Sequence, residues 1–89
     1  MSSKSQRMRS EWEILLDLLS ATAKDKNTKK TRIMQSAYLQ WKNFDKYFTY
    51  MIEKGLVEKN NSDEGNYELT EKGDELLGIL NKVDKILKK

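Results

Sequence analysis

Basic side chains concentrate in one short segment of this 89-residue chain. Between residues 24 and 46 there are seven Lys or Arg against two Asp or Glu, whereas the net charge of the whole chain is only +3. Amide groups at a helix start, together with cationic heads, can hold phosphate without reading sequence. The residues that offer this combination are Lys29, Lys30, Thr31 and Arg32. A basic segment in a nearly neutral chain favours a polyanion-binding surface, with a charged loop as the alternative.

A second polar group follows on a helix that we expect to run from about residue 40 to 54. At roughly 100° per residue, its apolar side chains share one side, and the opposite side carries Lys42, Asn43, Lys46, Thr49 and Tyr50. Lys and Asn are suitable donors to phosphates and base edges. The alternative is an ordinary solvated helix face, but the basic segment before it favours binding. Trp41 falls toward the core side, where we expect it to anchor the helix; base stacking or an interface is its other possible role.

A predicted hairpin comes next, with strands beginning near Leu56 and Tyr67 and a turn rich in Asn, Ser, Asp and Gly between them. Lys59 and Asn61 could reach a minor groove or a phosphate. Asp63 and Glu64 near the tip would repel one. The hairpin therefore gives a mixed signal.

Several classes of chemistry find no support. The chain has no Cys and no His, which excludes disulfides, thiolate sites and the commonest zinc ligands and general bases. There is no nucleophile–base pair and no glycine-rich phosphate loop. We therefore expect no enzyme activity, no catalytic or metal-binding residue, no cofactor and no small-molecule substrate. No apolar run approaches the roughly eighteen residues of a membrane span, and no signal peptide is evident, so a cytoplasmic protein is expected.

The predicted elements give an α+β fold, a winged helix-turn-helix of order α-α-α-β-β-α with a short extra strand possible before the second helix. Ser10, Thr28 and Thr70 are expected helix caps, Tyr38-Leu39 the tight turn and Gly55 the stop of the third helix. Three parts are expected: a disordered basic arm over residues 1–9, a winged-helix core over 10–70, and a C-terminal helix over 71–89.

The C-terminal helix carries an apolar seam of roughly two heptads. The residues that we expect to meet a second copy of the chain are Leu80, Val83, Ile86 and Leu87. Packing against the first helix is the alternative, and Leu76 and Leu77 are expected to do that. Because the last residues lie beyond the reach of so small a core, the sequence predicts a homodimer.

Several short motifs occur in an order that resembles a known family. They are Lys30-Thr31-Arg32-Ile33-Met34, Leu39, Tyr47, Lys54-Gly55-Leu56-Val57, and Tyr67-x-Leu-Thr-x-Lys-Gly73. The chain is similar to the archaeal winged-helix family that includes the small ten-kilodalton chromatin-associated DNA-binding proteins of the Sulfolobus type. The resemblance covers roughly residues 12–88 and implies double-stranded DNA binding and dimerisation through an antiparallel C-terminal coiled coil. Gln40 departs from the family's small hydroxyl cap, and the last helix is short for a coiled coil.

Together these observations predict double-stranded DNA binding by a dimeric transcriptional regulator or small chromatin protein associated with the nucleoid. The third helix, about residues 40–54, would enter the major groove. The competing interpretation is a winged-helix protein-interaction module in a transcription or replication complex.

Overall fold

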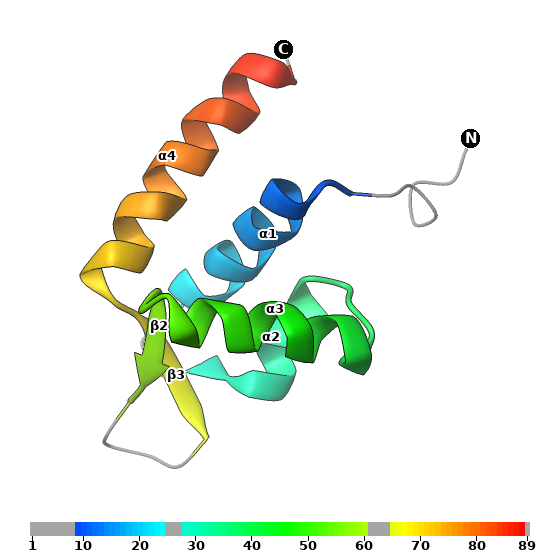
Figure 1. Ribbon diagram of the computed structural model, residues 1–89, viewed down its shortest axis with the longest axis vertical. Coiled ribbons are helices and arrows are strands. Elements are labelled where there is room, and N and C mark those ends of the chain that lie inside the picture. Colours follow the sequence, from blue (N-terminus) through cyan, green and yellow to red (C-terminus); the bar gives the residue numbers. More distant parts are fainter. Residues whose placement is uncertain (1–8, 25–27, 61–64, 89) are drawn as a thin grey trace.

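The computed structural model describes residues 9–24, 28–60 and 65–88. The elements are α1 Glu11–Ala23, β1 Thr28–Lys29, α2 Lys30–Ser36, α3 Trp41–Glu53, β2 Val57–Lys59, β3 Asn66–Leu69 and α4 Glu71–Leu87. Figure 1 shows α2 and α3 grouped beside the small sheet, while α4 extends away from the sheet and past α1. The predicted winged helix-turn-helix fold is confirmed, including the short strand before the second helix.

β3 is the central strand of the sheet, whose order is β1-β3-β2 with both pairings antiparallel. Thr28 pairs with Tyr67 and is buried, so its assignment as the cap of the second helix was wrong. The backbone at Thr28 is extended and belongs to the sheet, and α2 begins two residues later, with Lys29 at the N-cap position. Because β1 leads directly into α2, the first basic residues of the segment, Lys29 and Lys30, lie at the N-terminus of that helix.

Aromatic residues of α3 form the centre of the core. The rings of Phe44 and Phe48 stack with centroids 5.0 Å apart, and Tyr67 of β3 meets Phe48 edge-on at 4.9 Å. The other fully buried side chains include Leu18, Leu19, Ile33 and Met51. Ile52, which the helical spacing groups with Phe48 and Met51, is instead exposed, because it lies at the edge of the apolar face. Burying side chains of this size contributes about 1.5–3 kcal/mol each.

Two of the sequence motifs meet where α3 leads into β2 and β3 leads into α4. We call Gly55, Leu56, Thr70 and Gly73 the strand–helix junction. Thr70 caps α4, as predicted: its hydroxyl accepts from the Gly73 amide at 3.0 Å and donates to the Gly55 carbonyl. The Thr70 amide donates to the Leu56 carbonyl at 3.0 Å. A Cβ on Gly73 would lie only 2.1 Å from that same carbonyl oxygen, so the junction requires glycine there.

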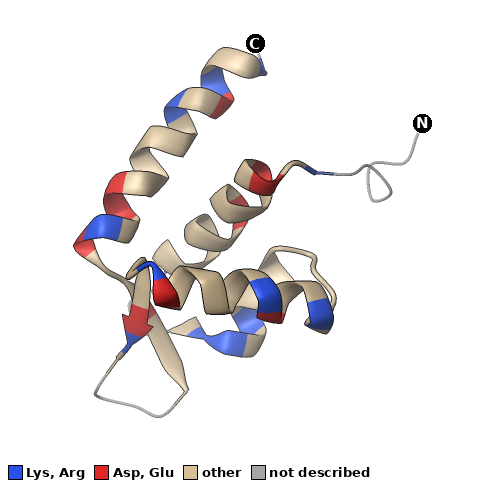
Figure 2. Cartoon of the chain, viewed as in Figure 1, with Lys and Arg blue, Asp and Glu red and all other residues tan. Residues whose placement is uncertain are grey.

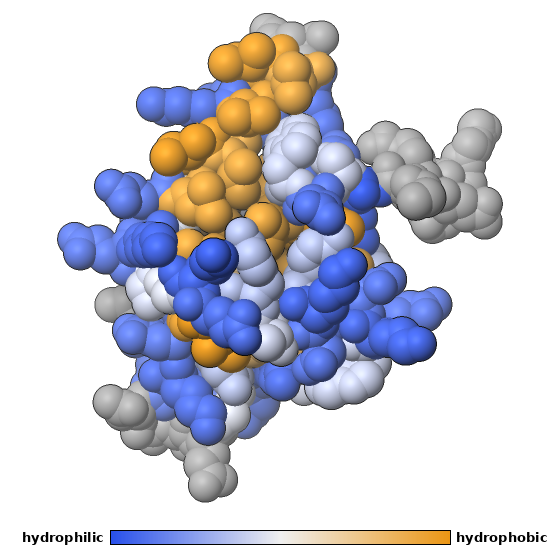
Figure 3. All heavy atoms as spheres, viewed as in Figure 1, coloured by the Kyte–Doolittle hydropathy of each residue, from blue (hydrophilic) through white to orange (hydrophobic). Residues whose placement is uncertain are grey.

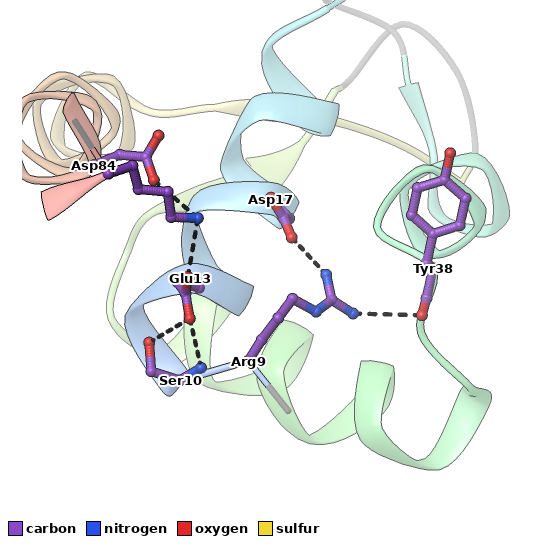
Figure 4. A network of polar contacts seen from close by, with 7 residues as sticks. Arg9, Ser10, Glu13, Asp17, Tyr38 and Asp84 are labelled. Atoms are coloured by element: carbon purple, nitrogen blue, oxygen red, sulfur yellow. Dashed lines mark hydrogen bonds and ion pairs between the residues drawn. The ribbon is translucent and has the colours of Figure 1, made fainter. Parts of the chain in front are cut away.

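The far end of α4 is held to the start of α1 by a polar network (Figure 4). The Glu13 carboxylate accepts from the Ser10 amide at 2.9 Å and lies 3.0 Å from the Lys88 ammonium, which also contacts Asp84 at 3.3 Å. The Ser10 amide, with help from Lys88 and the Ser10 hydroxyl, lowers the pKa of Glu13 from 4.5 to about 2. The same pairing with Glu13 raises the pKa of Lys88.

A second contact in this region fixes the residue before α1. Arg9 pairs with Asp17 and donates to the Tyr38 carbonyl at 3.4 Å. Residues 1–8 of the predicted arm lie outside the described residues, but Arg9 differs from that expectation because it bridges α1 and the turn before α3.

Candidate nucleic-acid interface

The cations of α2 lie on the same side of the molecule as those of α3 (Figure 2). Lys29, Thr31 and Arg32 are exposed and Lys30 is partly buried. The carboxylates of α1 lie in the N-terminal half of that helix. The fold therefore brings the cations of the two sequence segments, α2 and α3, to one side of the molecule.

Lys30 lies where α2 meets α3. Its ammonium is 5.4 Å from the ring centre of Trp41 and 5.4 Å from that of Phe48. Cation–π contacts of this kind contribute about 0.5–1 kcal/mol at exposed sites, and the aliphatic stem can cover apolar surface while the charge stays accessible. The Lys30 side chain is therefore partly buried and held against two aromatic rings, whereas the neighbouring Lys29 and Arg32 side chains are exposed.

The outer face of α3 is polar, as predicted. Lys42, Asn43, Lys46, Thr49 and Tyr50 are all exposed. Lys46 lies over the ring of Tyr47 at 5.3 Å and Lys54 over that of Tyr50 at 5.7 Å. Asp45 and Glu53 share the exposed surface, so the face carries charges of both signs.

Two aromatic side chains at the start of α3 are more exposed than the sequence indicated. Trp41 is 55% exposed, so the expectation that it anchors the helix in the core was wrong. It is the first residue of α3 and projects beyond the core, with one side near the Phe44 ring at a centroid distance of 5.9 Å. Tyr38 is 88% exposed and has a φ of 55°, in the left-handed region.

The turn explains the unusual backbone of Tyr38. Its amide and that of Leu39 donate to the Gln35 and Met34 carbonyls, at 3.1 and 3.3 Å, which ends α2 in the manner of a left-handed helix stop. Leu39 then packs against the core while Tyr38 points to solvent. The sequence analysis located this turn but missed the exposure of Tyr38. A left-handed helix stop is usually recognised by a Gly, and the Tyr at this position gives no such signal.

The hairpin contributes one described candidate. Lys59 at the end of β2 is exposed, and the Asn60 amide donates to the Asn66 carbonyl at 2.8 Å. Asn61, Asp63 and Glu64 lie outside the described residues, so their expected roles stay predictions.

The four predicted dimerisation residues of α4 differ in their exposure to solvent. Leu80 is only 9% exposed and belongs to the core of the single chain, so it offers little surface to a second copy. Ile86 and Leu87 are 73% and 64% exposed, Val83 is partly exposed, and Ile79, on the same flank as Ile86, is 56% exposed. Figure 3 shows apolar side chains gathered along α4.

Other functional classes can be checked only against the described part of the chain. Within residues 9–24, 28–60 and 65–88, no three Asp or Glu side chains come together as a metal site would require. None of the helices in those ranges is both long and apolar enough to cross a membrane.

A winged helix-turn-helix family matches residues 8–88, nearly the whole chain. The chain belongs to this family. The match agrees with the three-helix core, the β2–β3 wing and the resemblance found in the sequence motifs, which is thereby confirmed.

Relatives of this winged helix-turn-helix chain occur in archaea. Two uncharacterized proteins of Methanocaldococcus jannaschii are similar to it. MJ0287 is 37% identical over 79 residues, covering 89% of this chain and 77% of the relative. MJ0290 is 36% identical over 74 residues, covering 83% of this chain but only 33% of the relative.

A solved structure shares the fold. The crystal structure of Sso10a-2, a DNA-binding protein from Sulfolobus solfataricus, superposes with a TM-score of 0.77. The superposition covers 90% of this chain and 83% of that chain, at 24% sequence identity.

Proposed function

We propose that this protein binds double-stranded DNA as a homodimer, with α3 in the major groove and the cations of α2 on the phosphate backbone. The observation that carries the proposal is the joining of two basic segments, α2 and the outer face of α3, on one side of a winged helix-turn-helix. The DNA-binding activity stated for Sso10a-2 supports the same class of function.

The outer face of α3 fits this role in shape and chemistry. α3 has 13 residues, and its exposed side carries donors near its N-terminal half, including Lys42, Asn43 and Lys46. A major groove about 12 Å wide admits one such helix. Lys29, Lys30, Thr31 and Arg32, with Lys59 from the wing, would then lie near phosphates, which position a protein without reading sequence.

The proposed dimer uses the exposed flank of α4. Ile79, Val83 and Ile86 are spaced by four and three residues, as in a heptad seam, and Leu87 extends it. A contiguous apolar surface of this kind usually meets a partner. The contact between Lys88 and Glu13 holds α4 against α1, so the seam is presented on a fixed helix. A two-fold axis would then place two α3 helices to meet major grooves about 34–36 Å apart.

A gel-shift titration against random duplex DNA at two salt concentrations tests the binding proposal. Phosphate contacts release counterions, so affinity should fall steeply with salt, with a log–log slope of about −0.9 per contact. No shift at either salt would refute DNA binding and favour the protein-interaction module. A cytoplasmic, nucleoid-associated location follows from the proposal.

Sedimentation tests the dimer. Ile79→Glu with Ile86→Glu introduces two charges into the exposed seam and should give a folded monomer with weaker DNA binding. The matched control, Asn81→Glu with Lys85→Gln, makes the same change in net charge at exposed positions elsewhere on α4 and should leave the dimer intact. A wild-type chain that sediments as a monomer at high micromolar concentration would refute the homodimer.

Whether the protein is a transcriptional regulator or a small chromatin protein depends on base readout by α3. If a preferred site can be selected from random duplexes, Asn43→Ala should relax the preference at one base position, by about 1–3 kcal/mol for a bidentate contact. Equal losses on selected and random DNA would indicate a chromatin protein that uses α3 for positioning.

A further inference from the structure

We propose that Trp41 is a direct contact of the duplex, with its indole packed against the sugar–phosphate backbone beside a phosphate held by Lys30. The inference rests on the proposed DNA-binding function and adds to it a residue and a mode of contact. Neither the family match nor the sequence motifs single out this tryptophan.

The position of Trp41 is not explained by the core alone. Its side chain remains 55% exposed, although a tryptophan gains more from burial than almost any other residue. The Phe44 ring is 5.9 Å from one side and tilted by 35°, which orients the indole without covering it. A single exposed apolar side chain is ordinary on a protein surface, so the argument depends on its neighbours.

The neighbour in contact with the ring is a cation: the Lys30 ammonium lies 5.4 Å from the indole centre. Lys42, the next residue in the chain, is exposed. Among the described residues, the ion pairs are those of Arg9 and Lys88, so Lys30 has no carboxylate partner there. Its ammonium can therefore keep its contact with the ring and still donate to a phosphate oxygen.

The chemistry of the occupant follows from this pairing. An indole offers an apolar surface and one N–H donor, while each DNA backbone unit offers an apolar sugar edge and an anionic acceptor. Bases inside an intact duplex are stacked and cannot lie on the ring, so the contact should be independent of sequence. A single strand would instead stack its bases on the indole, which the experiment below distinguishes.

Trp41 also provides the signal for its own test. The chain has two tryptophans, and Trp12 lies partly buried on α1, packed against the core. In a Trp12→Phe variant, all tryptophan emission comes from Trp41. Titration with random duplex should change that emission, and the bound duplex should protect it from acrylamide quenching. In the Trp41→Phe control, the emission of Trp12 should not respond to DNA.

Affinity variants separate the two halves of the contact. Trp41→Phe keeps an aromatic ring but loses the N–H donor, so affinity should fall about two- to tenfold, the range of one net hydrogen bond. Trp41→Ala removes ring and donor together and should weaken binding further, by a similar factor on every duplex sequence. Circular dichroism should show both variants folded, because the Trp41 side chain is half exposed. If either variant fails to fold, the emission titration still tests the contact, because it uses the Trp12→Phe variant, in which Trp41 is intact.

The outcomes are distinguishable. Unchanged Trp41 emission on a duplex that demonstrably binds, with unchanged affinity in Trp41→Phe, would overturn this inference while leaving DNA binding intact. A single strand that binds more tightly than the duplex, and that lowers the Trp41 emission more strongly than the duplex does, would overturn the duplex contact. A wild-type chain that shifts no duplex at either salt would overturn the proposed function itself.

Discussion

The strand–helix junction and the basic α2–α3 surface both contain short sequence motifs. The residues of the junction are held by hydrogen bonds within the fold, whereas most residues of the basic surface are exposed to solvent. At the junction, Gly55, Leu56, Thr70 and Gly73 contact one another through backbone atoms and one hydroxyl. On the basic surface, Lys29 and Arg32 are exposed, and neither has an ion pair within the described part of the chain. The junction residues are therefore held by contacts within the fold, whereas Lys29 and Arg32 are exposed side chains with no ion pair in the described part of the chain.

The comparison predicts opposite consequences for two glycines of α4. Gly73→Ala should destabilise the protein by roughly 1–3 kcal/mol or more, because the new methyl group would collide with the Leu56 carbonyl and force the backbone to move. Gly78→Ala meets nothing within 4 Å and should stabilise the helix by about 0.5–1 kcal/mol. Urea unfolding of both variants measures the difference. Equal effects of the two substitutions would show that the junction is less closely packed than described.

The basic surface should show the reverse pattern, with a large change in DNA binding and only a small change in stability. Lys30→Met with Arg32→Met removes two charges while keeping an unbranched side chain at each position, including the one whose ammonium lies over the Trp41 and Phe48 rings. The salt dependence of duplex binding should become shallower by about one unit for each lost phosphate contact. Arg32→Met should change stability by no more than about 0.5 kcal/mol. Lys30→Met loses the cation–π contacts with Trp41 and Phe48 and should cost about 0.5–1 kcal/mol.

A matched pair of lysines on α4 controls for net charge. Lys72→Met with Lys85→Met removes the same charge from exposed positions away from α2 and α3. This control should preserve the slope of the wild-type chain. If both double variants flatten the slope equally, overall charge rather than the α2 surface governs binding.

Thr70 provides a smaller test at the junction. Thr70→Val keeps the shape of the side chain but loses both the bond accepted from Gly73 and the bond donated to Gly55. Loss of such a cap costs about 0.5–2 kcal/mol, which in a domain of this size lowers the Tm by about 4–8 °C per kcal/mol. Thr49→Ala, on the exposed face of α3, should leave the Tm nearly unchanged. A Tm that responds equally to both changes would contradict the difference between the two regions.

The same difference explains which parts could be predicted from sequence. The caps at Ser10 and Thr70, the stop at Gly55 and the apolar face of α3 are local features whose partners lie nearby in the chain, and they were located correctly. Thr28 was misassigned because its partner, Tyr67, is thirty-nine positions away in β3 and outweighs the local cap signal.

The exposure of Trp41 and the burial of Leu80 both differ from the sequence-based expectation for a geometric reason. A helical wheel gives the direction of a side chain but not how far the core extends along the helix. Trp41 points toward the core side yet projects past its end, while Leu80 points along the apolar stripe yet is covered by the chain's own core. The extent of coverage depends on how α1, α3 and α4 pack together, which is a property of the assembled fold.

Glu13 lies between these two extremes, since it is partly buried and has polar partners at the start of α1 and on α4. Its pKa is lowered from 4.5 to about 2 in the folded chain, so its contribution to stability is present above pH 4.5 and is lost as the pH falls from 4.5 toward 2. Glu13→Gln should therefore lower the Tm by a small amount at pH 7, and the difference from wild type should shrink below pH 4.5. The control Glu75→Gln removes an exposed carboxylate of α4 that forms no ion pair with the described residues, so it should show no such pH dependence. Thermal unfolding followed by circular dichroism between pH 3 and 7 measures both. A Tm difference for Glu13→Gln that stays constant across this range would mean that the contact with Lys88 does not hold α4 to α1 through charge, and the seam on α4 would then depend on apolar packing alone.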